Sequence, residues 1–455
     1  MGYKIPVARK QPAKKVADLP VITRPGFELF ELVGTNWIDG TERPVAVLWG
    51  FHPWKREFVS RYLPEYRLAF VRGNTHWGRL KKSLDQLQDL TFIAWGMSER
   101  PEVSNYAEDR NIPLYRMEDG FVRSADLGSR HTRPLSLVLD KQGIYFDASR
   151  PSDLEQLLNE HDFSSTPELL RASRELLVLI RNLKISKYNL GSLQAAHQIL
   201  GPKTRQRVLV IGQVEADASI RHGLGEGWTN HRLIEMAKAE NPEAEVIYRP
   251  HPDVAQGFRE NAHSAEALAQ LCRVMTEDVM LGDLFQAVDH VYTLTSLSGF
   301  EAVVHGLPVT VVGAPFYAGW GLTDDRMPVP RRTRSLTLDE LFCAAYLLYP
   351  RYLGSQTDCV RGCLSAILAV TAQRRQSLDA QMLPALATNA PQTLLASEYW
   401  PAAFRPNLFT PIAATFGDKL HQALDIGRIF GGDSGEYFQR SMAYLLAAIW
   451  DPVFH

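Results

Sequence analysis

The stretch DHVYTLTSLSGFEAVVHGLPVTVVG (289–313) determines the expected fold. It begins with a short apolar run that ends in hydroxyl residues at 293–296. Apolar side chains at helical spacing follow at 298–306, up to a glycine, and a second apolar run occupies 308–313. A strand, a helix and a strand in this order predict a βαβ unit with parallel strands.

The same alternation continues on both sides of this stretch. We expect strands at 207–212 and 245–252, the second ending at its prolines, with a helix at 231–240 between them. Nearer the N terminus, three short apolar runs each end in glycine: 44–50, 67–73 and 90–96. The chain therefore belongs to the α/β class, and its second half reads as a doubly wound fold.

Other segments break the strand–helix alternation. The runs 134–140 and 143–148 predict a hairpin with a turn at Lys141 and Gln142, and the periodicity at 152–200 predicts helices. In that region Thr166 is the expected N-cap, with Pro167 in the first helical position. Further helices are expected at 336–353, 416–430 and 436–450. Four parts follow from these patterns: an N-terminal arm (1–43), a first α/β lobe with a helical bridge (44–200), a second α/β lobe (201–353) and a helical C-terminal extension (354–455).

Composition limits the possible function classes. The 455 residues carry a formal net charge of -2, which argues against a nucleic-acid-binding protein. Four scattered cysteines fit a reducing cytosol better than a disulfide framework. No apolar signal region and no apolar run of about 18 residues is visible, so we expect a cytoplasmic protein. The basic residues of 1–20 leave two interpretations open: a solvated tail, or contact with anionic lipid at the inner membrane.

The residues that could carry chemistry follow the predicted strands. Doubly wound sheets bind ligands at the carboxyl ends of their strands, and a helix N terminus there attracts anions. Ser296 and Ser298 would add hydroxyl donors, Gly299 would permit close approach of the backbone to a ligand, and Glu301 could reach a ribose hydroxyl. The alternative is an ordinary N-cap followed by a capping-box-like glutamate, and the segment alone does not decide between them.

Other strand ends carry further candidates. Arg249 and His251 lie between prolines and suit a phosphate or carboxylate, whereas a single histidine is more often structural. Glu215 and Asp217 could act as nucleophile and acid/base, or could cap a helix. Glu118 and Asp119 could activate an acceptor hydroxyl, or form a turn. The loop 314–326 could cover a sugar or a cytosine, or pack as a turn.

Together these segments resemble the KpsC family of capsule polysaccharide β-Kdo transferases. The resemblance covers roughly residues 44–353. The matching motifs are EDGFVRSADLG (118–128), PLSLVLDKQGIYFDA (134–148), KISKYN (184–189), GQVEADASI (212–220), RPHPDV (249–254), TSLSGFEAVVHGLPV (295–309), PFYAGWGLTDDR (315–326) and LTLDEL (336–341). The resemblance implies a GT-B-like fold of two Rossmann-like lobes, of which the first binds the acceptor and the second binds the donor. It also implies a retaining transfer of Kdo from CMP-Kdo that forms a β-linkage without a metal or cofactor.

The resemblance also implies residue roles. Asp217 would be the nucleophile, with Glu215 as the other carboxylate of that loop, and Glu118 or Asp119 would assist proton transfer. The residues expected to hold CMP are Gln213, Arg249, His251, Ser296, Ser298, Gly299 and Glu301.

This sequence departs from the family pattern in one respect. Typical members have two tandem transferase modules, whereas this chain has one, so we expect one linkage type. The acceptor would be a glycan or a lipid-linked saccharide, and capsule-assembly proteins are candidate partners. Two alternatives remain: a CMP-sialic-acid transferase, or a non-catalytic capsule-assembly scaffold. An ATPase is disfavoured because the chain lacks the G-x-x-x-x-G-K-[ST] loop.

Overall fold

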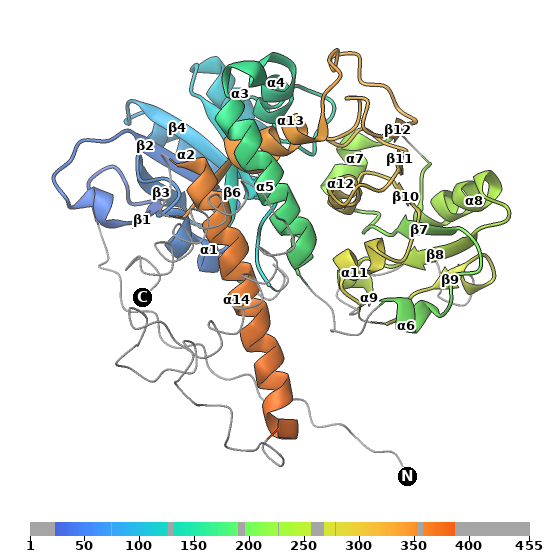
Figure 1. The fold of residues 1–455 in the computed structure, drawn as a ribbon. Coiled ribbons are helices and arrows are strands. Elements are labelled where there is room, and N and C mark those ends of the chain that lie inside the picture. The colour runs from blue at the N-terminus through green and yellow to red at the C-terminus, as the bar shows by residue number, and fades with distance from the viewer. Residues whose placement is uncertain are drawn as a thin grey trace, which may run out of the picture. The chain divides into compact units, whose positions relative to one another are not determined.

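The computed structural model describes residues 23–73, 75–125, 131–189, 196–225, 227–255, 268–277, 279–353 and 358–386, with side chains up to Arg374. The basic segment 1–20 and the helices expected at 416–430 and 436–450 lie outside the described residues. The chain forms two compact units (Figure 1). The first comprises Met1–Glu118, Val138–Tyr145 and Arg150–Asp153, and the second comprises Asp119–Leu137, Phe146–Ser149 and Leu154–His455.

The first unit is built on a mainly parallel sheet. Its strands are β1 (Phe30–Val33), β2 (Val45–Trp49), β3 (Arg67–Val71), β4 (Leu90–Trp95), β5 (Leu114–Asp119) and β6 (Ser136–Asp140), in the spatial order β1-β3-β2-β4-β5-β6. The three glycine-terminated runs expected as strands are therefore confirmed as β2, β3 and β4. Helices α1 (Pro53–Val59), α2 (Trp77–Leu84) and α3 (Pro101–Asp109) connect them.

Strand β1 lies within the stretch 1–43 that the sequence analysis describes as an N-terminal arm. It pairs antiparallel with β3, and Phe30 and Leu32 join the same buried cluster as Trp37. Burial of these side chains from water stabilises a strand that precedes the recognisable α/β pattern.

The second unit contains a six-stranded sheet in the order β12-β11-β10-β7-β8-β9. The strands are β7 (Arg207–Ile211), β8 (Glu245–Arg249), β9 (Arg273–Val274), β10 (His290–Thr293), β11 (Val309–Val311) and β12 (Asp324–Asp325), and all neighbouring pairs are parallel. The chain winds from β7 to β8 on one side and returns to place β10 on the other. The doubly wound fold is thus confirmed, with its topological switch point between β7 and β10.

Helices complete the second unit (Figure 1). They are α6 (Ala196–Leu200), α7 (Ala218–Gly223), α8 (Asn230–Glu240), α9 (Pro252–Ala255), α11 (Leu281–Phe285) and α12 (Leu297–Val304). The helical bridge is confirmed as α4 (Asp153–Glu160), the 3-10 turn η3 (Phe163–Ser165) and α5 (Pro167–Leu183). Thr166 is the N-cap of α5 as expected, although its side chain makes no capping hydrogen bond.

Two predicted elements are wrong. No strand forms at 143–148, because the Asp140 carboxylate accepts hydrogen bonds from the backbone N–H groups of Gln142 (3.0 Å) and Gly143 (2.7 Å) and turns the chain. The segment 336–353 is not one helix. It forms α13 (Leu338–Phe342), a π-helical turn (Cys343–Leu348) and strand β13 (Pro350–Tyr352), followed by α14 (Cys359–Leu386).

Candidate functional site

Two loops meet at the switch point of the second sheet. Gln213 follows β7 and Thr295 follows β10, and both are buried. The Gln213 side chain donates to Thr295 Oγ1 (3.1 Å) and accepts from the Thr295 backbone N–H (2.8 Å). The Gln213 backbone exchanges two further hydrogen bonds with the Asn230 side chain, each 2.9 Å long. Gln213 therefore fixes the two loops to one another, and its predicted contact with CMP stays a prediction.

The N terminus of α12 opens at this edge of the sheet. Ser296 is the N-cap, and its Oγ accepts from the Ser298 backbone N–H at 3.2 Å. The positive end of the helix dipole and its unpaired N–H groups make this position favourable for an anion. The N-cap of the alternative interpretation is present, but Glu301 does not complete a capping box, since the Ser296 N–H donates to Thr293 Oγ1 (3.2 Å) and Glu301 Oε1 accepts the Lys187 N–H.

The structure requires glycine at position 299, for a reason that the sequence did not reveal. A Cβ atom at this position would lie 2.1 Å from the Tyr317 hydroxyl and 2.8 Å from Thr293 Cγ2. The space beside Gly299 is thus taken by Tyr317, and the predicted contact of Gly299 with CMP stays a prediction.

Glu301 is a buried carboxyl that connects α12 to another loop. Its Oε1 accepts the Lys187 backbone N–H at 2.6 Å, and the residue is 4% exposed. Burial raises the pKa of Glu301 to about 7, although the Lys187 N–H and the charges of Lys187 and Arg249 lower it in part. The expected contact with a ribose stays a prediction.

Arg249 and His251 end β8 at the same edge of the sheet. The Arg249 guanidinium donates from Nη2 to the Val279 carbonyl (2.7 Å), which holds its side chain in place. His251 Nδ1 accepts the Asp253 backbone N–H at 3.1 Å, so a neutral ring carries its proton on Nε2. This tautomer suits donation to an oxyanion.

The two carboxylates after β7 have different surroundings. Glu215 accepts the Asn230 backbone N–H (2.8 Å) at the start of α8, as the helix-cap alternative predicted. Asp217 is the N-cap of α7 and accepts both the backbone N–H (2.8 Å) and the hydroxyl (2.9 Å) of Ser219. Asp217 is exposed, so it is the more accessible of the two.

The two acidic residues at the end of β5, Glu118 and Asp119, belong to different units. Glu118 is partly buried and belongs to the first unit. Asp119 belongs to the second unit and accepts Arg123 Nε at 2.6 Å, while Arg123 is 1% exposed. Next to them, a Cβ at Gly120 would lie 2.3 Å from Ser136 Oγ, so this turn requires glycine. Oδ2 of the Asp119 carboxylate is thus held in an ion pair with the buried Arg123.

The aromatic loop at 314–326 is packed and does not form a cover. Phe316, Tyr317 and Trp320 are 4%, 0% and 0% exposed. Phe316 and Tyr317 lie against Phe300, and Trp320 Nε1 donates to the Phe316 carbonyl (2.7 Å). The expectation that these rings cover a sugar or cytosine is wrong.

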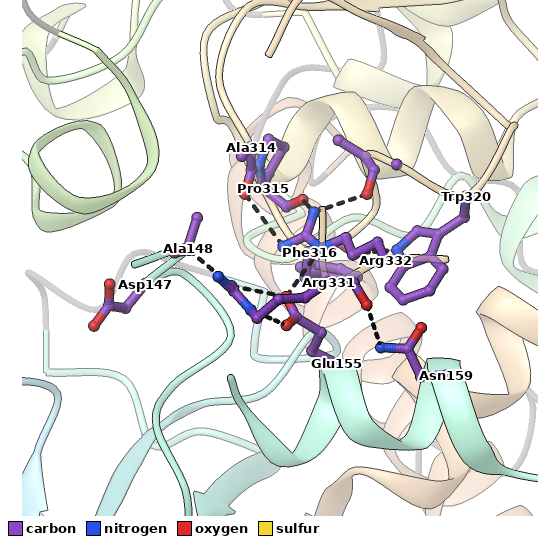
Figure 2. A network of polar contacts seen from close by, with 12 residues as sticks. Asp147, Ala148, Glu155, Asn159, Ala314, Pro315, Phe316, Trp320, Arg331 and Arg332 are labelled. Atoms are coloured by element: carbon purple, nitrogen blue, oxygen red, sulfur yellow. Dashed lines mark hydrogen bonds and ion pairs between the residues drawn. The ribbon is translucent and has the colours of Figure 1, made fainter. Parts of the chain in front are cut away.

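Sequence reasoning also missed an ion network that holds this loop (Figure 2). Glu155 accepts Arg331 Nε (2.7 Å) and Arg332 Nε (3.0 Å), and Arg332 is 9% exposed. Two adjacent arginines in a sequence usually indicate an exposed segment, and nothing local marks Arg332 as buried.

Two features are absent from the described residues. No group of three or more His, Cys, Asp or Glu side chains gathers there in a way that could hold a metal ion. In the same residues, no helix is long and apolar enough to span a membrane.

Comparisons with known proteins agree on one family. The sequence model of the family described as "Capsule polysaccharide biosynthesis protein" matches residues 92–177 and 168–352. The lipopolysaccharide-processing protein LpsZ of Rhizobium meliloti is 45% identical over 389 residues, which cover 83% of this chain and 88% of LpsZ. The capsule polysaccharide modification protein LipA of Neisseria meningitidis serogroup B is 39% identical over 68% of this chain, but the match spans only 43% of LipA.

Two solved structures of Thermosulfurimonas dismutans KpsC have the same fold. The one described as a β-Kdo 2,4 transferase is 34% identical, with a TM-score of 0.59 and coverage of 70% of this chain and 94% of that chain. The one described as a β-Kdo 2,7 transferase is 30% identical, with a TM-score of 0.55 and coverage of 72% and 99%. The GT-B-like fold expected from the resemblance is thereby confirmed.

Proposed function

The chain belongs to the KpsC-type family of capsule polysaccharide biosynthesis proteins, and on that premise we propose that it is a retaining glycosyltransferase. It transfers Kdo from CMP-Kdo to a glycan or lipid-linked saccharide and forms a β-linkage in a bacterial surface polysaccharide. The observation that carries this proposal is the switch point of the second sheet, where the loops after β7 and β10 are joined by Gln213 and Thr295. Ligands of doubly wound folds bind at such a point.

The donor site follows from the charges at this edge. The N terminus of α12 receives the CMP phosphate, because its backbone N–H groups and dipole favour an anion. Arg249 supplies a fixed positive charge, and His251 supplies a hydrogen-bond donor. Ser296 and Ser298 add hydroxyl groups at the same helix end. The proposal needs no cofactor, and it places the reaction in the cytoplasm, at the inner membrane where the acceptor is lipid-linked.

The reaction proceeds in two balanced steps. In the first, the Asp217 carboxylate attacks C2 of Kdo, the bond from C2 to the phosphate oxygen breaks, and CMP leaves with the electron pair. In the second, the acceptor hydroxyl attacks C2 from the opposite face, the ester to Asp217 breaks, and the hydroxyl proton passes to a carboxylate base. Two inversions leave the configuration retained.

The surroundings of the four carboxylates suggest which one acts as nucleophile and which one acts as base. Asp217 is exposed at the N terminus of α7, whereas Glu215 is tied to the start of α8, so Asp217 is the nucleophile. Asp119 is held by Arg123, so Glu118 is the base.

A donor assay tests the proposed function. The full chain is incubated with a Kdo-terminated acceptor and either CMP-Kdo or CMP-Neu5Ac, and the product is analysed by NMR. We expect CMP release and a β-Kdo linkage with CMP-Kdo alone. Use of CMP-Neu5Ac would support the sialic-acid alternative, and turnover of neither donor would support a non-catalytic scaffold.

Substitution of Asp217 tests the nucleophile. Asn caps a helix about as well as Asp, so Asp217→Asn keeps the cap of α7 and removes only the nucleophilic charge. We expect transfer to fall by about 10³-fold or more, with folding intact. The measurement is kcat with CMP-Kdo.

Asp162 offers a matched control. It also accepts the backbone N–H (3.0 Å) and hydroxyl (2.6 Å) of the residue two positions on, Ser164, at the start of η3. Asp162→Asn should therefore leave kcat unchanged. If the two variants transfer Kdo at the same rate, Asp217 is a helix cap and not the nucleophile.

A further inference from the structure

We propose that Tyr317 is a positioning residue for the N terminus of α12, and that Arg332 holds Tyr317 in place. The inference rests on the proposed function, because it concerns the same anion site. It assigns a role to the loop at 314–318, whose aromatic side chains do not face a ligand.

The contact that carries the inference is one buried hydrogen bond. The Tyr317 hydroxyl donates to the Ser296 carbonyl oxygen at 2.6 Å, and Tyr317 is 0% exposed. Burial raises the pKa of Tyr317 well above its ordinary value, so the hydroxyl keeps its proton and remains a donor.

This bond is the second one to the same peptide group, because the Ser296 carbonyl also accepts the Gly299 N–H (3.0 Å) in the first turn of the helix. The Ser296 carbonyl and the Leu297 N–H belong to one planar peptide unit, in which the two bonds point in opposite directions. Leu297 is the first residue of α12, and its N–H is one of the groups that a helix leaves without an internal partner. The helix itself directs this N–H outward, and by adding a second hydrogen bond to the carbonyl Tyr317 restricts the motion of this peptide group, where the proposed phosphate binds.

Packing around Gly299 leaves the Tyr317 hydroxyl little room to move. A Cβ at Gly299 would lie 2.1 Å from that hydroxyl, so glycine here is a condition for the hydrogen bond. The Tyr317 ring also stacks against Phe300 of the same helix, with centroids 6.0 Å apart and planes at 25°. The Tyr317 ring therefore packs directly against helix α12.

Arg332 fixes the backbone on both sides of Tyr317. Its Nη1 donates to the carbonyl oxygens of Pro315 (2.5 Å) and Ala318 (2.7 Å), and its Nε donates to Glu155 at 3.0 Å. A buried ion network of this kind adds little net stability, because removing its charges from water is costly. Its effect is geometric: the planar guanidinium holds the loop in one conformation.

Tyr317→Phe tests the inference, with Tyr352→Phe as a matched control. The Tyr352 hydroxyl also donates to a backbone carbonyl, that of Tyr346, at 2.6 Å, and it is buried in the same unit. Each substitution removes one hydroxyl and one hydrogen bond, so both variants should lose a similar amount of stability in urea unfolding.

The two variants should differ in donor binding. For Tyr317→Phe we expect the Kd for CMP, measured by titration calorimetry, and the KM for CMP-Kdo to rise by about fivefold to tenfold, with kcat within about twofold of the unaltered chain. For Tyr352→Phe all three values should stay unchanged. If Tyr317→Phe loses stability like the control but binds CMP as tightly as the unaltered chain, the inference is overturned.

The same measurements separate this inference from the proposed function. If the unaltered chain binds CMP but does not transfer Kdo, the proposed function fails, and the ratio of the CMP Kd values still decides the role of Tyr317. If the unaltered chain does not bind CMP, both proposals are overturned.

Discussion

At the scale of single residues, Glu301 links the pH of the solution to the stability of the fold. Its pKa is about 7 in the folded chain, against an ordinary value of 4.5, because burial disfavours the charged form. The folded state therefore binds the proton more tightly, and its contribution to stability is full below about pH 4.5 and is lost as the pH rises through about 7. Glu301→Gln removes the titration while keeping an oxygen that can accept the Lys187 N–H.

We expect the free energy of unfolding to fall between pH 5 and pH 8 by about 2–3 kcal/mol more in the unaltered chain than in Glu301→Gln. Urea unfolding at both pH values measures this difference. Glu28→Gln is the control, since Glu28 also accepts a backbone N–H, that of Gly26 (3.0 Å), but is exposed. Equal pH dependence in the unaltered chain and Glu301→Gln would contradict this account.

Residue roles could be predicted from the sequence where the contacts are local. Ser296 caps α12 through a bond to a residue two positions away, and such contacts follow from residue type and position. The contacts that join Gln213 to Thr295 and Glu301 to Lys187 cross 82 and 114 positions, and no local pattern contains them. Glu301 does not complete a capping box for this reason, because it bonds to a distant loop.

At the scale of elements, Glu155 on α4 anchors the segment 331–332 through two arginines. Glu155 and Arg332 have side chains that are 6% and 3% exposed. Removal of one partner from a buried ion network leaves the other charge without compensation, so Glu155→Gln should lower the free energy of unfolding by about 3 kcal/mol. The control is Arg174→Gln, which breaks an exposed pair with Asp339 and should cost less than about 1 kcal/mol. Similar small losses in both variants, measured by urea unfolding, would show that removal of Glu155 leaves no uncompensated buried charge.

Strands and helices could be predicted where a single hydrophobic pattern extends over the whole segment. Strand β2 and residues 208–211 of β7 are apolar runs, as expected where both faces of a strand are buried. The hairpin at 134–148 failed because the Asp140 side chain competes for backbone N–H groups, so a single residue outweighs the surrounding pattern there. The helix predicted at 336–353 is divided: α13 ends at Phe342, a π-helical turn follows, and β13 begins at Pro350.

At the scale of the whole molecule, the sequence predicted two α/β units. It did not predict which residues belong to each unit. The first unit takes residues from three separated stretches, since 119–137 and 146–149 belong to the second. Hydrophobic periodicity reflects residues that are close in sequence. It cannot show that a short segment belongs to a different unit from the residues on either side of it. The boundaries at 43, 200 and 353 stay predictions.

Assignment of the donor to the second unit predicts where CMP protects the backbone. A ligand that binds only the folded state suppresses local opening near its site, and amide hydrogen exchange slows there. Addition of CMP to the full chain should slow exchange at 295–299 and 212–223 and leave β2, β3 and β4 unchanged. Inorganic phosphate at equal concentration should slow exchange at 295–299 less, because it lacks the nucleoside contacts. Protection confined to the strands of the first unit would reverse the assignment, and would require the CMP phosphate to bind somewhere other than the N terminus of α12.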